Sequence, residues 1–443
     1  MYIKRVQLGF LHAAVAMTLV PINSTLNRVM IKELALSATL VAILASLPYL
    51  FSPIQVFIGS FSDQHPILGY RRTPYIAFGL ILCVLGVVLT PQAALLIATN
   101  FWLGLVVGIL TFGAWGMGYN FAAVSYLSLA SELSGEKGHS RTISVMFFMM
   151  IVGIILTALG LSRLLESYSP GALERAFFVV AMTALFLGVL GLIRLEPRTK
   201  DRTESAANLA ADVAEKRSGF GSQLRAIFAN RQVTLFFIYL VILLVAILGQ
   251  DILLEPYAAE AFGMSVQETT RITAIWGVCF LLSLVVAGIA EGRVSKRSVA
   301  KIGAWGAILA FLLIAGSGIL LNLVVFYLGV VLLGLATGLA TVSNLSLMLD
   351  MTVAGKVGLF IGAWGMANAF SRLIGSVGSG VVRDVTTQIS QNQVAGYVIV
   401  FVIEAALLIV SLVLLQRISV NVFRKQAGVE PTVVERAAMV NEA

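Results

Sequence analysis

Two acidic residues stand one helical turn apart near the end of a long apolar stretch of the chain. They are Asp251 and Glu255, and Pro256 directly follows Glu255. In a helix, a spacing of four positions places both carboxylates on one face. Inside a membrane an ionised side chain costs at least about 2.5–3.5 kcal/mol, so such a pair could bind a proton, a cation or a partner's arginine. The alternative is an interfacial pair that contacts water and caps the end of the helix.

Two further ionisable residues, Arg372 and Glu404, fall inside apolar stretches later in the chain. Arg372 and Glu404 could compensate each other, or Arg372 could compensate Asp251 across a helix bundle. A structural ion pair and a group that recognises substrate are both consistent with this pattern.

Several uncharged polar residues lie in the same kind of apolar stretch. The asparagines among them are Asn23, Asn27, Asn120, Asn344 and Asn368. They could line a cavity, or each could form a hydrogen bond between helices. The two cysteines, Cys83 and Cys279, also lie in apolar runs, and no cluster of cysteine and histidine predicts a metal site.

The elements that carry these residues are expected to be membrane-spanning helices. Apolar residues make up 59% of the 443 residues and charged residues 12%, whereas a soluble domain has about 25% charged residues. A span needs roughly 20 apolar residues. The sequence predicts twelve spans, at residues 7–30, 36–60, 74–90, 98–131, 142–166, 173–194, 231–254, 271–291, 299–320, 323–349, 357–382 and 395–416.

The basic residues are distributed unevenly between the two sides that these spans would define. The net charge is +8, and most of the 30 lysines and arginines fall in segments that share one side. Such a bias marks the cytoplasmic side, so we expect both termini there and no binding of nucleic acid. The sequence carries no glycine-rich phosphate loop, dinucleotide fingerprint or metalloprotease helix, so we do not expect an enzyme.

The longest polar interruption divides the predicted spans six and six. We therefore expect one half at residues 1–194, a cytoplasmic linker at 195–230, a second half at 231–420 and a cytoplasmic tail at 421–443. Residues 125–132 at the end of the fourth span are similar to residues 343–350 at the end of the tenth, and an acid ends both. These features predict an all-α membrane protein with two six-helix pseudo-repeats, the architecture of major facilitators.

The loop between the second and third predicted spans is similar to a loop of major facilitators at the same place. Its residues of interest are Gly59, Asp63, Gly69, Arg71 and Arg72. An acid and two arginines in a short loop can bridge helix ends through charge-assisted hydrogen bonds and act as a gating latch. The alternative is that the arginines only fix the orientation of the chain in the membrane.

Three stretches resemble one branch of the major facilitators, the PucC/LhaA or bacteriochlorophyll delivery family. They are residues 26–34 (Leu-Asn-Arg-Val-Met-Ile-Lys-Glu-Leu), residues 58–63 with 69–75, and residues 250–257 (Gln-Asp-Ile-Leu-Leu-Glu-Pro-Tyr) with 262–265. The likeness extends over nearly all of the predicted membrane core. The chain departs from the family pattern at Ser24 and Thr25, where Gly-Thr is expected, and at Ala258 and Ala259, where Gly-Gly is expected.

The resemblance implies a membrane assembly factor with chlorophyll or bacteriochlorophyll as its cargo. Its partners would be light-harvesting, reaction-centre or photosystem apoproteins, and its location a bacterial inner (intracytoplasmic) or thylakoid membrane. The departures leave the pigment and the subgroup open. The fold by itself is also consistent with a proton-coupled secondary transporter of a small solute.

A chlorophyll needs a Lewis base for its magnesium and a flat apolar slot for its ring. His12 is a candidate ligand because it is the one histidine inside a predicted span, although a packing role is the alternative. Glycines beside tryptophan in Gly-Ala-Trp-Gly, at 113, 303 and 362, could form a slot, or could simply allow close helix packing. The candidate pigment- or substrate-binding residues are therefore His12, Asn23, Asn27, Asn120, Asp251, Glu255, Asn344, Asn368, Arg372 and Glu404.

Overall fold

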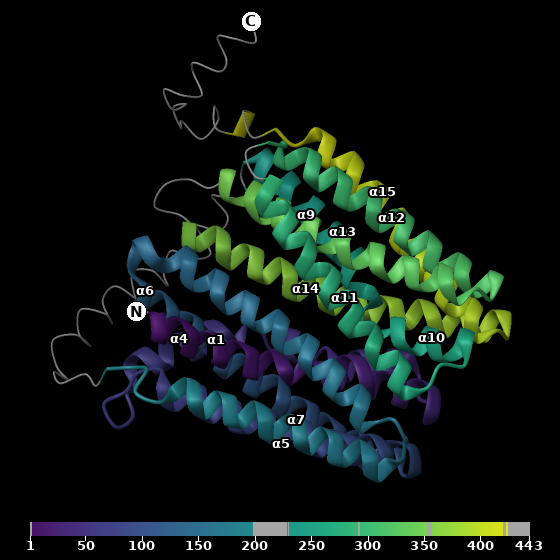
Figure 1. Ribbon diagram of the computed structural model, residues 1–443, viewed down its shortest axis with the longest axis horizontal. Helices are drawn as coiled ribbons and strands as arrows, with labels where there is room; N and C mark the ends of the chain where they lie inside the picture. The colour runs from purple at the N-terminus through teal and green to yellow at the C-terminus, as the bar shows by residue number, and fades with distance from the viewer. Residues whose placement is uncertain are drawn as a thin grey trace, which may run out of the picture.

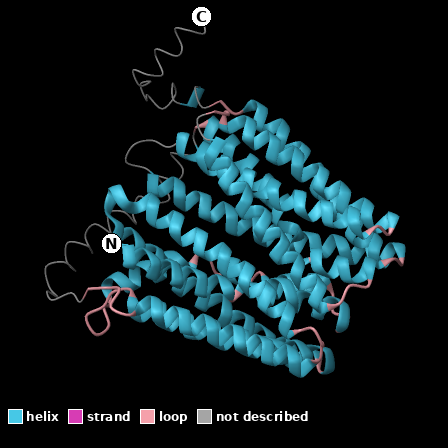
Figure 2. Cartoon of the chain, viewed as in Figure 1, coloured by secondary structure: helices cyan, strands magenta, loops and turns pink. Residues whose placement is uncertain are grey.

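The computed structural model describes residues 2–197, 228, 230–290, 293–351, 357–419, 422 and 423. These residues form a bundle of long helices, in which α1 begins and α15 ends at the same end (Figure 1). Helices account for nearly all of the ordered elements, as Figure 2 shows, and the one piece of β structure in the described ranges is an isolated bridge between Ile67 and Tyr70. The predicted linker and tail fall largely outside these ranges.

The helices of the first half pack together in the lower part of Figure 1. Their bounds are α1 Tyr2–Met17, η1 Pro21–Leu26, η2 Val29–Glu33, α2 Ala38–Ala45, α3 Leu47–Leu50, α4 Ile54–Gln64, α5 Thr73–Thr99, α6 Phe101–Leu164 and α7 Pro170–Leu192. The two η elements are π-helical turns that continue α1.

The long helical run α6 contains two of the predicted spans, at Phe101–Ser134 and Arg141–Leu164. Its two parts lie against the same helix, because the ring of His12 on α1 is 5.3 Å from the ring of Tyr126 and 5.0 Å from that of Phe147. A straight helix could not bring both rings to one histidine. The run therefore reverses its direction between the two spans.

The helices of the second half occupy the upper part of Figure 1. Their bounds are α9 Arg231–Gly249, η3 Gln250–Ile252, α10 Leu254–Phe262, α11 Val266–Ala290, α12 Lys296–Leu320, α13 Leu323–Asp350, α14 Val357–Ser390 and α15 Gln393–Arg417.

Short polar side chains set where many of these helices begin. A side-chain oxygen that accepts a hydrogen bond from the first helical turn satisfies an amide that has no partner within the helix. The residues that cap a helix in this way are Ser37, Asn100, Ser169, Asn230, Ser295, Asn322 and Asn392. The long apolar runs between these caps become the spans.

Ten of the described helices are long and apolar enough to cross a membrane, so the predicted number of twelve is not confirmed. The expected span at 36–60 is divided into α2, α3 and α4, because prolines at positions 48 and 53 start new helical segments and lack the amide that a continuous helix needs. The expected span at 357–382 lies in α14, which has 34 residues. Its length is sufficient to cross a membrane.

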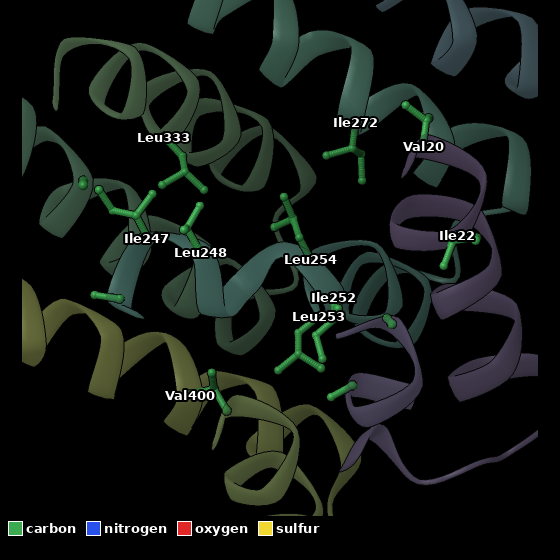
Figure 3. Close-up of a cluster of buried hydrophobic side chains, with 14 of the residues drawn as sticks. Val20, Ile22, Ile247, Leu248, Ile252, Leu253, Leu254, Ile272, Leu333 and Val400 are labelled. Carbon is green, nitrogen blue, oxygen red and sulfur yellow. The ribbon is translucent and has the colours of Figure 1, made fainter. Parts of the chain in front are cut away.

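One large cluster of buried apolar side chains joins the two halves. Figure 3 shows Val20 and Ile22 of the first span beside Ile272 of α11, together with residues of α9, α10, α13 and α15. The halves also meet where α14 contacts α2 and α3, and where α11 contacts α6.

The internal repeat that the sequence predicts has a structural counterpart. Glu132, the last residue of the stretch 125–132, accepts from Arg72 at 3.1 Å. Asp350, the last residue of the similar stretch 343–350, accepts from Lys296 at 2.8 Å. In each half the base precedes one span and the acid ends the next. The two acids therefore hold corresponding pairs of helices together, which supports the interpretation of the halves as pseudo-repeats.

Candidate functional site: a polar centre between the two halves

Arg372 and Asp251 form an ion pair in the middle of the bundle. Arg372 Nη1 on α14 donates to Asp251 Oδ2 on η3 at 2.5 Å, and the side chains are 34% and 25% exposed. The amide of Gln250 donates to Asp251 Oδ1 at 2.9 Å. Tyr49 on α3 in the other half places its ring 5.5 Å from the guanidinium carbon, an arrangement typical of a cation–π contact. The structure thus realises one of the two pairings that the sequence left open.

Breaks in three spans bring this pair together. The π-helical η1 contacts η3, and α14 contacts both η3 and the short α3. Irregular backbone at membrane depth needs partners other than lipid. Asn120 on α6 supplies one in the second span, because its amide donates to the carbonyl of Pro48 at 2.9 Å, and its oxygen accepts from the side chain of Gln55 at 2.5 Å. Asn120 therefore fixes the broken second span beside the site.

Glu255 lies nearby but has a different partner from Asp251. Its Oε1 accepts from the hydroxyl of Thr273 on α11 at 2.6 Å, and the same hydroxyl lies 2.9 Å from that of Ser24 in the first span. Its Oε2 is buried and has no partner among the described residues. The sequence predicts both acids on one side of a helix, but Asp251 contacts α14 and Glu255 contacts α11. The reason is that the helix changes from η3 to α10 between them.

Glu404 is buried on α15 at 2% exposure, and it does not pair with Arg372. Its Oε1 accepts from Ser379 at 3.3 Å, whereas Oε2 has no partner in the described part of the chain. A side chain at Gly249 would collide with Glu404, since a Cβ there would lie 2.7 Å from Oε1. The glycine therefore makes room for a carboxyl group deep inside the second half.

The remaining asparagine candidates mostly form local or interhelical hydrogen bonds. Asn344 accepts from Tyr239 on α9 at 2.7 Å, Asn368 donates to the carbonyl of Trp364 at 2.9 Å, and Asn27 donates to the carbonyl of Asn23 at 2.9 Å. Only Asn368 of these lies on the same helix as Arg372, one turn away.

His12 occupies a different place from the polar centre. Its ring is 8% exposed and lies between the rings of Tyr126 and Phe147. Its Nδ1 is buried without a hydrogen-bond partner among the residues described. These contacts place His12 in the packing between α1 and both spans of α6, where a bulky ligand would first have to separate those helices.

Arg72 joins the loop between α4 and α5 to neighbouring helices of the first half, and the role of this loop as a gating latch stays a prediction. Arg72 donates to Glu132 on α6, to the Ser62 hydroxyl at 2.6 Å and to the carbonyl of Gly59 at 3.3 Å. Gly69 has a φ of +82°, so it supplies the left-handed turn before the arginines. The side chain of Asp63 lies outside what the structure describes.

Glu196 also holds this loop, and the sequence pattern did not mark it. Its carboxylate accepts from the backbone amides of Arg71, Arg72 and Thr73, at 2.8 Å, 3.1 Å and 2.7 Å. It caps α5 from a position more than a hundred residues further along the chain. Only its place next to Pro197, just after α7, could have marked it, and that place indicates a linker as readily as a cap.

A second group of residues joins the halves at the end away from the termini. Arg28 donates to the carbonyl of Met264 at 3.0 Å, and Lys32 pairs with Glu260 at 2.6 Å. Asp384 on α14 accepts from the amides of Ala38 and Thr39 at the start of α2. We call the contacts of Asp384 with α2 the α2–α14 clasp.

Lys32, Glu260 and Asp384 carry no pattern in the sequence that marks them as a cluster, although Arg28 and Lys32 fall inside one of the family strings. Lys32, Glu260, Arg383 and Asp384 line a cavity of about 650 Å³ at this end.

The fold and its polar centre define the class of the protein. Two halves that meet around charged and hydroxyl-bearing groups at broken helices are typical of major facilitators. The nucleoside transporter NupG is 17% identical and covers 94% of this chain and 99% of its own, with a TM-score of 0.70. A bacterial homologue of the lysosomal transporter Spinster is 12% identical, covers 97% and 98%, and has a TM-score of 0.73. These likenesses establish the fold.

The chain belongs to the PucC family. The family described as PUCC protein matches residues 25–423. Protein PucC of Cereibacter sphaeroides is 31% identical over 93% of this chain and 91% of its own length. The bacteriochlorophyll synthase 44.5 kDa chain of Rhodobacter capsulatus is 26% identical over 85% and 87%. The expected family is thereby confirmed, and the chain is a multi-pass membrane protein of that family.

Proposed function

We propose that this protein binds chlorophyll or bacteriochlorophyll and delivers it to light-harvesting, reaction-centre or photosystem apoproteins. The observation that carries the proposal is family membership over nearly the whole chain. A relative that bears the name bacteriochlorophyll synthase 44.5 kDa chain supports a role with this class of pigment. The polar centre between the halves supplies a place where a ligand can be oriented.

In this proposal the protein is a carrier and not an enzyme. It resides in a bacterial inner (intracytoplasmic) or thylakoid membrane with both termini in the cytoplasm, and it contacts antenna or photosystem subunits but no nucleic acid. The basic residues near the ends of α4, α5 and α12 support this orientation, because positive loops favour the cytoplasmic side.

The absorption spectrum of the protein purified from a phototroph in mild detergent tests the proposal. We expect a red or near-infrared pigment band in the purified fraction, together with at least one antenna or photosystem subunit. A preparation of an unrelated membrane protein from the same cells, carried through the same steps, controls for pigment that partitions into micelles. Protein that holds neither pigment nor subunit above that control would contradict the proposal.

A second candidate function is proton-coupled transport of a small solute. It is supported by two buried carboxyl groups that each have one oxygen without a hydrogen-bond partner in the described structure. Oε2 of Glu255 and Oε2 of Glu404 are buried without partners in the described structure, and such a group costs free energy when ionised. On this reading, proteoliposome uptake driven by a pH gradient is lost in Glu404→Gln and kept in Glu166→Gln, which changes an exposed residue. Uptake that is equal in both variants would argue against coupling through Glu404.

A further inference from the structure

Arg372 uses only part of its hydrogen-bonding capacity. A guanidinium carries five N–H groups in a planar fork, and Nη1 donates to Asp251 in the one hydrogen bond that this side chain makes among the described residues. One third of the side chain is accessible. The edge formed by Nε and Nη2 is therefore free to bind a second planar acceptor.

Two tyrosines lie near Arg372. Tyr49 lies over the guanidinium from the first half, and Tyr119 on α6 is near enough to interact with Arg372 electrostatically. The hydroxyls of both tyrosines make no hydrogen bond with the residues that the structure describes, and neither is a buried group left without a partner. An anion at Arg372 would thus meet a cation in a polar part of the bundle.

A flat, open surface continues from Arg372 along α14. Gly365 lies two helical turns before Arg372, so the two share a face. A Cβ on Gly365, or on Gly362 one turn further, would meet nothing within 4 Å. The surface therefore offers room for a broad ring, with a polar anchor at one end.

We propose that Arg372 binds the free carboxylate of an unesterified chlorin or bacteriochlorin pigment, whose ring lies along the Gly362–Arg372 face of α14. The inference rests on the proposed function and adds to it the free-acid form of the pigment, which this site binds. Asp251 keeps Nη1 and the Gln250 amide, while the ligand carboxylate takes the opposite edge of the guanidinium. Chlorophyll and bacteriochlorophyll are esters and lack the charge that this edge recognises, so they bind this site more weakly than the free acid and are released from it more readily.

Binding of two matched pigments by the purified full-length protein tests this inference. Chlorophyllide a carries a free propionate, and its methyl ester has the same ring without the charge. Quenching of the fluorescence of the five tryptophans gives a dissociation constant for each. We expect the acid to bind about tenfold or more tightly than the ester, because hydrogen bonds to charged groups are the strong ones.

Two variants test whether Arg372 causes the preference for the acid over the ester. In Asp251→Asn/Arg372→Gln, which removes both charges of the pair together, acid and ester are expected to bind equally. Arg163→Gln changes an exposed arginine at the end of α6 and should retain the preference of the natural sequence. The thermal midpoint of each variant is measured first, so that only folded protein is compared.

The outcomes separate this inference from the proposed function. Equal binding of acid and ester by the natural sequence, or an unchanged preference in the double variant, overturns the inference and leaves pigment binding in place. Displacement of chlorophyllide a by palmitate at equal affinity also overturns it, since the site would then recognise any amphiphilic carboxylate. Failure of both pigments to bind overturns the inference and the proposed function together.

Discussion

Replacing Asp384 with asparagine is expected to shift the protein toward an arrangement in which α2 and α14 are separated. The Asp384 carboxylate accepts from Ala38 N at 3.1 Å, Thr39 N at 2.8 Å and the Thr39 hydroxyl at 2.7 Å, across the boundary between the halves. An amide would turn one acceptor into a donor facing these donors. It would also remove the negative charge from the positive end of the α2 dipole.

The expected size of this effect follows from the bonds that are lost. Hydrogen bonds to charged groups contribute roughly 1.5–3 kcal/mol each. A loss of about 2 kcal/mol across the α2–α14 clasp changes the ratio of closed to open protein by roughly thirtyfold. An open population that is too small to detect in the natural sequence would then become measurable.

Distances between two spin labels at this end measure the opening. Labels at Ser167→Cys in the first half and Ile389→Cys in the second occupy exposed positions, and the native Cys83 and Cys279 are buried. We expect Asp384→Asn to add a longer distance to the distribution. Asp350→Asn, which breaks an ion pair within one half, serves as the control. A distribution that Asp384→Asn leaves unchanged would show that the clasp does not hold the halves together.

The second large effect is expected for Arg372→Gln, which leaves the Asp251 carboxylate without its cation. Removing one partner of a buried pair costs roughly 3–5 kcal/mol. Because both side chains are partly accessible, we expect about 1–3 kcal/mol here. The double variant Asp251→Asn/Arg372→Gln is expected to recover most of the loss, since two neutral amides can satisfy each other.

Thermal unfolding in detergent, followed by tryptophan fluorescence, orders these variants. The midpoint of Arg372→Gln should be the lowest, and that of the double variant should be close to the natural sequence. Arg372→Lys keeps the charge without the planar fork, so its midpoint should fall between the two. A double variant that unfolds as early as Arg372→Gln would mean that the cost arises from lost packing and not from an isolated charge.

The elements of the fold and the central pair could be predicted because their signals are local. Runs of apolar residues longer than a bilayer, and ionisable residues inside them, are visible without tertiary information. Arg372 has few counter-charges within the apolar stretches, and Asp251 is one of the two acids that the sequence analysis offered it. The charged turn at Gly69, Arg71 and Arg72 was visible because these residues lie within one short loop, whereas Glu132, the partner of Arg72, lies on another helix.

The rest depended on contacts between distant parts of the chain. Glu196 and Asp384 stand near helix ends, where acids usually contact water, and only the tertiary fold brings the starts of α5 and α2 to them. The division of the second span had a local signal in Pro48 and Pro53, but a uniform apolar composition concealed it. Glu255 and Asp251 were expected together because the change of helix between them has no sequence mark of its own.

The matching pairs Arg72–Glu132 and Lys296–Asp350 bear on the origin of the chain. A bond that recurs at the same location in both copies of a duplicated gene is most simply inherited from the single ancestral unit. In that ancestor, a six-helix protein, an ion pair already joined the second loop to the end of the fourth helix. Two such subunits would have assembled before their genes fused. The Arg372–Asp251 pair has no counterpart in the first half among the residues described, so it would have arisen after the fusion, when the copies were free to diverge.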